Sequence, residues 1–202
     1  MRVLVTGASG ALGQDVCALL ADRGYEAVPV RGVNLSDADA AREAIDALAD
    51  AGRFHGIVNV AGGFTWETVM DGDVETWDRM WSMNLKTTLN TCRAAIPHLE
   101  DGGSIVNIGA AAASKAVAGM GAYTASKSAV ARLTEALSEE LAPRRIRVNA
   151  VLPTMFDTPT NRSDMPDADF DKWLKPRQVS NIVAFLLSEE SSAITGASIA
   201  TR

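Results

Sequence analysis

Short runs of apolar residues alternate with longer amphipathic stretches along almost the whole chain. The apolar runs predict six strands, at residues 2–6, 26–30, 56–60, 104–108, 146–152 and 197–200. The amphipathic stretches predict helices at residues 11–23, 36–51, 74–96, 121–142 and 178–187. Strands that are apolar on both faces and are separated by helices form parallel sheets covered on both sides. We therefore expect an α/β fold, a doubly wound parallel sheet with three α/β/α layers.

Composition narrows the kind of protein. A chain of 202 residues, 47% hydrophobic and 22% charged, fits one globular domain spanning residues 1–202. The net charge of −6 argues against nucleic acid or an anionic membrane surface as a partner. The first strand begins at residue 2, which leaves no room for a signal peptide. Cys17 and Cys92 lack metal-ligand spacing, so we expect no metal and two reduced thiols in a cytoplasmic protein.

The segment Tyr123-Thr-Ala-Ser-Lys127 carries the most chemical information. A spacing of four in an alanine-rich run places the two side chains one turn apart on the same helix face. The pKa of a free tyrosine is about 10, and a neighbouring ammonium group lowers it toward the range of a general acid. The alternative is that both are amphipathic residues on a helix surface.

A glycine-rich turn, Thr6-Gly-Ala-Ser-Gly-Ala-Leu-Gly13, joins the first strand to the first helix. In this position glycines let the backbone approach a pyrophosphate, and the helix N-terminus offers unpaired amide groups. No Gly-Lys-Ser/Thr follows, which excludes a P-loop. The alternative is a tight turn with a purely structural role.

The turn and the Tyr123/Lys127 pair together resemble the short-chain dehydrogenase/reductase family. Asn59-Val-Ala-Gly62 is similar to a stretch that follows the family's fourth strand. Asn84 matches its helix asparagine, and 153–158 resembles the segment after its sixth strand. The family's commoner glycine spacing has its middle glycine at position 11, where this chain has Ala11 preceded by Gly10. The resemblance implies a Rossmann-like fold, an NAD or NADP cofactor, a small-molecule substrate and a homodimer or homotetramer.

The resemblance also assigns roles to residues. It makes Tyr123 the proton donor, with Lys127 lowering its pKa and binding the nicotinamide ribose, and Asn84 helping to hold a water in the proton relay. It places the cofactor against the following residues: Gly7, Ser9, Gly10, Ala11, Leu12, Gly13, Arg31, Asn34, Leu35, Ala61, Gly62, Gly63, Tyr123, Lys127, Pro153, Thr154, Phe156 and Thr158.

The choice between the two cofactors rests on the end of the second strand. An acidic residue there would bind the ribose 2′-hydroxyl of NAD, but the chain has Val30-Arg31-Gly32. Arg31 could hold a 2′-phosphate, which favours NADP slightly; the alternative is a solvated arginine. Asn34 occupies the position where an aspartate commonly meets the adenine, and its carbonyl can still accept a hydrogen bond.

One family residue is absent. A serine thirteen residues before the tyrosine polarises the substrate carbonyl in the family, and that position is Ala110. The dihydropteridine reductases also lack this serine, since their quinonoid substrate needs no such polarisation. The segment 152–173 and the stretch 61–64 resemble that branch as well. Ala110, Phe64 and Trp173 are therefore the candidate substrate-binding residues.

Three functions stay open at this point. The first is an NAD(P)H-dependent oxidoreductase that transfers hydride to an activated small molecule such as a quinonoid dihydropterin. The second is a general carbonyl or alcohol dehydrogenase, and the third is a non-catalytic NAD(P)-binding sensor or scaffold. Residues 159–175 are either a lid over the substrate or a surface loop. Trp77 and Trp81 share a helix face and are packing residues, whether internal or at a subunit interface.

Overall fold

A computed structural model describes all 202 residues, and its centre is a single parallel sheet of six strands. The strand order is β2-β1-β3-β4-β5-β6. The strands are β1 (Arg2–Thr6), β2 (Glu26–Pro29), β3 (Phe54–Asn59), β4 (Leu99–Ile108), β5 (Arg147–Leu152) and β6 (Ser198–Ala200). Every neighbouring pair is parallel, which confirms the predicted doubly wound, Rossmann-like α/β class.

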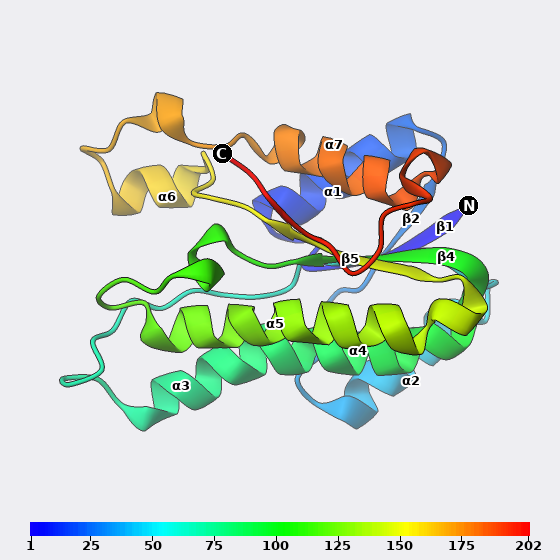
Figure 1. Ribbon diagram of the computed structural model, residues 1–202, viewed down its shortest axis with the longest axis horizontal. Helices are drawn as coiled ribbons and strands as arrows, with labels where there is room; N and C mark the ends of the chain where they lie inside the picture. The colour runs from blue at the N-terminus through cyan, green and yellow to red at the C-terminus, as the bar shows by residue number, and fades with distance from the viewer.

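Helices cover both faces of the sheet. They are α1 (Ala11–Asp22), α2 (Ala38–Ala49), α3 (Val74–Met80), α4 (Thr87–Ala95), α5 (Gly121–Glu140), α6 (Pro159–Asp164) and α7 (Pro176–Leu187). Helices α1 and α7 lie on one face, while α2, α3, α4 and α5 lie on the other (Figure 1). The three layers expected from the sequence are thus present. None of the helices has the length and apolar character needed to span a membrane.

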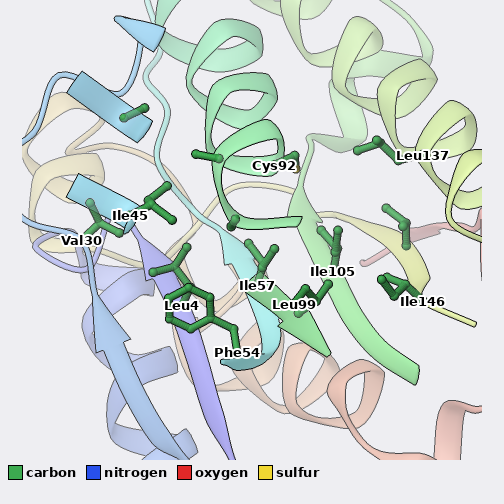
Figure 2. Close-up of a cluster of buried hydrophobic side chains, with 14 of the residues drawn as sticks. Leu4, Val30, Ile45, Phe54, Ile57, Cys92, Leu99, Ile105, Leu137 and Ile146 are labelled. Carbon is green, nitrogen blue, oxygen red and sulfur yellow. The ribbon is translucent and has the colours of Figure 1, made fainter. Parts of the chain in front are cut away.

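Each face of the sheet has its own hydrophobic core. On the side of α2, α4 and α5, residues such as Leu4, Ile57 and Ile105 point toward the helices and are fully buried (Figure 2). On the side of α1 and α7, the alternate strand residues, including Val5 and Val106, form a second cluster. Because successive strand residues point to opposite faces, an unbroken apolar strand supplies both cores at once.

The expected helix 74–96 is wrong in one respect. Between α3 and α4 the chain forms a π-helical turn, Trp81–Lys86, so the helix is continuous but widened in the middle. The π-helix is rare and is found mostly as single turns at functional sites. The segment carries Asn84, which is fully buried. Nothing in the local residue pattern distinguishes this turn from regular helix.

The stretch 153–175, expected to be irregular, is more ordered than its composition indicates. It contains helix α6 and a short 3₁₀ turn, Phe170–Lys172. Thr158 caps α6, since its hydroxyl oxygen accepts a hydrogen bond from the Asn161 amide at 3.2 Å. Pro159 occupies the first helical position, where its missing N–H costs nothing. The predicted boundaries of the other elements differ by a few residues from those observed, and β4 begins five residues earlier.

Candidate active site

The candidate site lies where β1 and β3 end. β1 pairs with β2 on one side and with β3 on the other. The connection after β1 therefore leads to one side of the sheet and the connection after β2 leads back to the other, so the strand order reverses between β1 and β3. Ligands of open α/β sheets bind at such switch points. The Thr6 hydroxyl oxygen accepts hydrogen bonds from the Val60 amide at 3.1 Å and the Ala61 amide at 3.2 Å, which joins the two strand ends.

Two glycines of the N-terminal turn are required by the packing of the chain itself. Gly7 has φ +64°, and a Cβ on it would lie 2.7 Å from the Ala61 amide nitrogen. A Cβ on Gly13 would clash with the carbonyl of Gly7. Gly10 is different, because its φ of −80° suits any residue and a Cβ would meet only the Gly7 oxygen, at 3.5 Å. Nothing within the chain therefore requires glycine at position 10.

The amino end of α1 fits a pyrophosphate. The amides of Ala11, Leu12 and Gly13 donate no hydrogen bond within the chain, and the first turn holds no acidic residue. Ser9, Gly10 and Ala11 are exposed, so the turn itself lies at the surface, whereas Leu12 and Gly13 are buried. Unpaired amides and the positive end of the helix dipole together favour an anion. The chain thus has a suitable cradle for the phosphates of a dinucleotide.

The two kinds of glycine should respond differently to substitution. Gly13→Ala forces the backbone of the turn to move, and we expect it to lower the free energy of unfolding by about 1–3 kcal/mol. Gly10→Ala leaves the fold stable and weakens dinucleotide binding, because its methyl group occupies the approach path. Thermal unfolding and NADPH fluorescence titration measure the two effects. Similar losses of stability in both variants would contradict this assignment.

The end of β2 presents the residues expected near the adenosine ribose. Arg31 is exposed and forms no ion pair or hydrogen bond within the chain. Burial raises the pKa of the Cys17 thiol on α1, and the charge of Arg31 counteracts part of this rise, so the guanidinium lies near α1. Leu35 belongs to the core. The Asn34 side-chain oxygen already accepts two hydrogen bonds from Ser36, at 2.7 and 3.2 Å, and its contact with adenine stays a prediction.

Asn84 and the loop after β3 hold each other in place. The Asn84 Oδ1 atom accepts a hydrogen bond from the Gly63 amide at 3.0 Å, and its Nδ2 donates to the Gly63 carbonyl at 3.1 Å. A Cβ on Gly62 would lie 2.6 Å from Asn84 Oδ1 and 3.2 Å from the Lys127 ammonium nitrogen. Position 62 therefore has room only for glycine, and three candidate site residues meet there. The role of Asn84 in holding a water stays a prediction.

Tyr123 lies in the first turn of α5, partly buried against the loop after β3. The ring of Phe64 meets the Tyr123 ring edge-on, with centroids 5.0 Å apart and planes at 86°. Burial raises the pKa of the phenol to about 12. The phenol is therefore fully protonated at neutral pH, which is the form that donates a proton.

The environment of Lys127 differs from the one expected for a residue that lowers the pKa of Tyr123. It is buried, and its ammonium nitrogen donates a hydrogen bond to the Ile108 carbonyl at 2.8 Å. Burial lowers its own pKa to about 8. The sequence spacing predicts that Lys127 lowers the pKa of Tyr123, but the structure shows no such effect: the cost of burial dominates both groups. Two of the three ammonium protons remain available for a ribose or a water.

A residue that the sequence analysis missed connects the two parts of the site. The hydroxyl of Ser126 accepts a hydrogen bond from Asn84 Nδ2 at 3.0 Å and donates one to the Tyr123 carbonyl at 2.7 Å. It is buried, one residue before Lys127. The serine in Tyr123-Thr-Ala-Ser-Lys127 was visible in the sequence, but only the fold shows that it faces the π-helical turn.

The candidate substrate site lacks a side-chain hydroxyl group at position 110, where the family has a serine. Ala110 is buried at the end of β4, just before a short 3₁₀ turn, Ala111–Ser114. The nearest serine along the chain is Ser114, which is exposed, and its hydroxyl donates to the Ala111 carbonyl at 2.9 Å. The 3₁₀ turn itself is held by the Ala111 amide, which donates to the Pro153 carbonyl at 2.9 Å.

The segment after β5 lies beside this turn. The Thr154 amide donates to the Thr201 hydroxyl at 3.3 Å, and Phe156 pairs with Leu174 in an isolated parallel bridge. Trp173 is half-buried next to that bridge. The structure thus gathers the glycine turn, the loop after β3, the start of α5 and the segment 153–158 at the carboxyl end of the sheet, as the sequence predicted.

A dinucleotide cradle with a phenol and a lysine beside it defines a dinucleotide-dependent oxidoreductase. The family model described as enoyl-(acyl carrier protein) reductase matches residues 1–201. The chain is 29% identical to 3-oxoacyl-[acyl-carrier-protein] reductase of Thermotoga maritima, with 96% of this chain and 92% of that protein aligned. It is 30% identical to carbonyl reductase [NADPH] 2 of Sus scrofa, with 98% and 93% aligned.

Solved structures agree. A short-chain type dehydrogenase/reductase from Mycobacterium ulcerans superposes with a TM-score of 0.89 and 26% identity, over 99% of this chain and 87% of that one. A metagenomic blue fluorescent protein in complex with NADPH gives a TM-score of 0.89 and 25% identity, over 99% and 95%. The chain belongs to the short-chain dehydrogenase/reductase family and is an NAD(P)-dependent oxidoreductase. Its Asn59-Val-Ala-Gly62 stretch follows the third strand, β3, and not a fourth.

Proposed function

We propose that this protein is an NADPH-dependent reductase of a small, flat, conjugated substrate, with quinonoid dihydropterin as the first candidate. The observation that carries the proposal is Ala110, an apolar residue where a carbonyl-polarising hydroxyl would stand, in a site that keeps Tyr123 and Lys127. Losing one such donor costs a carbonyl reduction about 10²–10³ in rate. A substrate that is already electron-poor does not need that donor.

The residues of this chain would divide the work as follows. NADPH supplies the hydride when bound, and the glycine turn with the amides of Ala11 to Gly13 would hold its phosphates. The Tyr123 phenol, protonated at neutral pH, donates the proton that the reduced substrate requires. Lys127 would bind the nicotinamide ribose with its free ammonium protons. The exposed ring of Phe64, fixed against Tyr123, offers a face on which a flat ring can stack.

The preference for NADPH rests on Arg31. Arg31→Asp should weaken NADPH binding by about 10- to 100-fold, since it removes a bidentate charged contact with the 2′-phosphate and adds repulsion. NADH binding should change little. Fluorescence titration with both cofactors measures this. Arg42→Asp, at an exposed arginine of α2 that pairs with Asp39, is the matched control. Equal losses for the two cofactors would remove the assignment.

The pH dependence follows from Lys127. Its pKa of about 8 means that the ammonium form, which binds the ribose, is lost as the pH rises through that value, while Tyr123 stays protonated up to about 12. We expect kcat/KM for reduction to be constant below pH 8 and to fall about tenfold per pH unit above it. Lys127→Arg, whose guanidinium stays charged, should move the fall to higher pH. A flat profile between pH 7 and 10 would contradict this role.

A substrate panel tests the proposal directly. Rapid NADPH oxidation with quinonoid dihydropterin, and slow oxidation with aldehydes and ketones, is the expected result. The opposite ranking would favour a general carbonyl or alcohol dehydrogenase, a reading that the similarity to carbonyl reductase [NADPH] 2 supports. Tight NADPH binding with no turnover on any substrate would identify a sensor or scaffold.

We also propose a homodimer or homotetramer in the cytoplasm. Trp77 and Trp81 remain 40% and 45% exposed, and this exposed aromatic surface supports contact with a second copy. Light scattering during size-exclusion chromatography measures the oligomeric state, and Trp81→Glu should dissociate the assembly.

A further inference from the structure

Residues 155–174, called the lid below, form a loop that is closed at its base by its own backbone. The Asp157 amide donates to the Leu174 carbonyl at 2.8 Å, and the Leu174 amide donates to the Met155 carbonyl at 2.8 Å. Leu174 is 5% exposed and belongs to the core cluster between the sheet and α1 and α7. The base of the lid is therefore part of the rigid fold, on the same side of the molecule as the start of α5 (Figure 1).

One side chain connects the two halves of the lid. The Arg162 guanidinium donates two hydrogen bonds to the Asp157 carboxylate, at 2.5 and 2.9 Å, in the bidentate geometry that arginine favours. The same guanidinium lies over the Phe170 ring, with its central carbon 4.6 Å from the ring centroid. Arg162 thus makes an ion pair with Asp157, before α6, and a cation–π contact with Phe170, in the 3₁₀ turn near the end of the lid.

The Phe170 ring in turn supports Trp173. Their ring centroids lie 4.8 Å apart at an interplanar angle of 57°. Trp173 directly precedes Leu174, so its backbone is fixed by the base, and its indole packs against the Phe170 ring. The contacts run in order from Asp157 through Arg162 and Phe170 to Trp173.

The other ion pair of the lid, between Lys172 and Asp169, does not join distant segments. Lys172 contacts Asp169 at 3.0 Å, three residues away, and its side chain is 81% exposed. No aromatic ring lies against its ammonium group. An isolated exposed pair of this kind contributes little to order. The lid therefore contains one cation that joins distant segments and one that does not.

We propose that Arg162 is a positioning residue that fixes the indole of Trp173 in the wall of the substrate site, acting through the Phe170 ring. The part of this proposal that concerns substrate rests on the proposed function; the part that concerns the order of the lid does not. Breaking the contact lowers the fraction of molecules whose lid is competent to bind, and the apparent affinity for substrate falls by the same factor.

The test compares Arg162→Met with Lys172→Met as the matched control. Each removes one lid cation and keeps an unbranched side chain. Protein labelled with 5-fluorotryptophan gives one ¹⁹F resonance for each of its four tryptophans, and Trp173→Phe identifies the relevant one. Steady-state kinetics with the best substrate of the panel, and NADPH titration, complete the set.

We expect Arg162→Met to shift or broaden the Trp173 resonance and to raise KM about 5- to 20-fold, from the combined loss of an ion pair and a cation–π contact. NADPH affinity and kcat should change less than twofold. Arg162→Lys keeps the positive charge but loses the two-pronged guanidinium group. It should therefore show smaller changes than Arg162→Met in both the Trp173 resonance and KM. Lys172→Met should behave as the unmodified protein.

An unchanged Trp173 resonance in Arg162→Met, or the same change in Lys172→Met, would overturn the proposal. A shifted resonance with unchanged KM would overturn the placement of Trp173 in the substrate wall. If no substrate of the panel is reduced, the proposed function fails, whereas the ¹⁹F comparison still decides whether Arg162 orders Trp173.

Discussion

Tyr123→Phe should lower kcat for reduction by about 10²- to 10⁴-fold, the range that a positioned general acid contributes. The phenol is protonated at neutral pH because burial raises its pKa to about 12, and its ring is held by the edge of Phe64. Phenylalanine preserves that ring contact and removes only the hydroxyl. For a substrate that is protonated easily, we expect the fall in kcat to lie near the lower end of this range.

The chain provides a matched control for this change. Its other tyrosine, Tyr25, stands at the start of β2, at the opposite end of the sheet from the site. Tyr25→Phe should leave kcat unchanged, and both variants should bind NADPH as the unmodified protein does. Stopped-flow measurement of NADPH oxidation separates the chemical step from product release. Undiminished turnover in Tyr123→Phe would eliminate the acid role.

Ala110→Ser should raise kcat/KM for aldehydes and ketones by about 10²–10³, the value of one donor to a developing oxyanion. Ala110 is 5% exposed at the end of β4, so a hydroxyl there is shielded from water and acts in a low dielectric. Reduction of quinonoid dihydropterin should change little, because that substrate does not develop charge on a carbonyl oxygen. The variant therefore moves specificity from one substrate class toward the other.

Ala112→Ser, two residues further along and inside the 3₁₀ turn that follows Ala110, serves as the control. It adds the same hydroxyl beside the site without placing it at the position of the missing donor. Initial rates on one ketone, one aldehyde and the pterin distinguish the variants, and thermal unfolding shows whether the buried hydroxyl lowers stability. A gain on carbonyls in both variants, or in neither, would mean that position 110 does not decide specificity.

Local sequence signals predicted the parts of this protein that depend on local geometry. The glycine turn was recognisable because Gly7 and Gly13 must be glycines for backbone and steric reasons. Tyr123 and Lys127 were recognisable because the spacing of four places them on one helix face. The strands were recognisable because a parallel sheet buries both faces, which leaves unbroken apolar runs.

Features that depend on long-range packing were not predictable. The hydrogen bond from Lys127 to the Ile108 carbonyl joins residues 19 apart, and no spacing rule foresees it. The pKa of Tyr123 is decided by the amount of protein around it, which the sequence does not show. Similarly, the composition of residues 159–175 left a lid and a surface loop as alternatives and gave no sign that Arg162 joins two segments of this stretch.

The π-helical turn has a geometric consequence for the long helix that contains it. Five of its buried residues, Thr76, Met80, Asn84, Thr88 and Cys92, stand at intervals of four positions. A regular α-helix rotates by about 100° per residue, so such a row would drift by about 160° around the axis and leave the interior. The wider turn rotates less per residue and cancels much of this drift. One residue more or fewer in that turn would rotate the rest of the helix about its axis, so the length of the turn is constrained as well as the identity of Asn84.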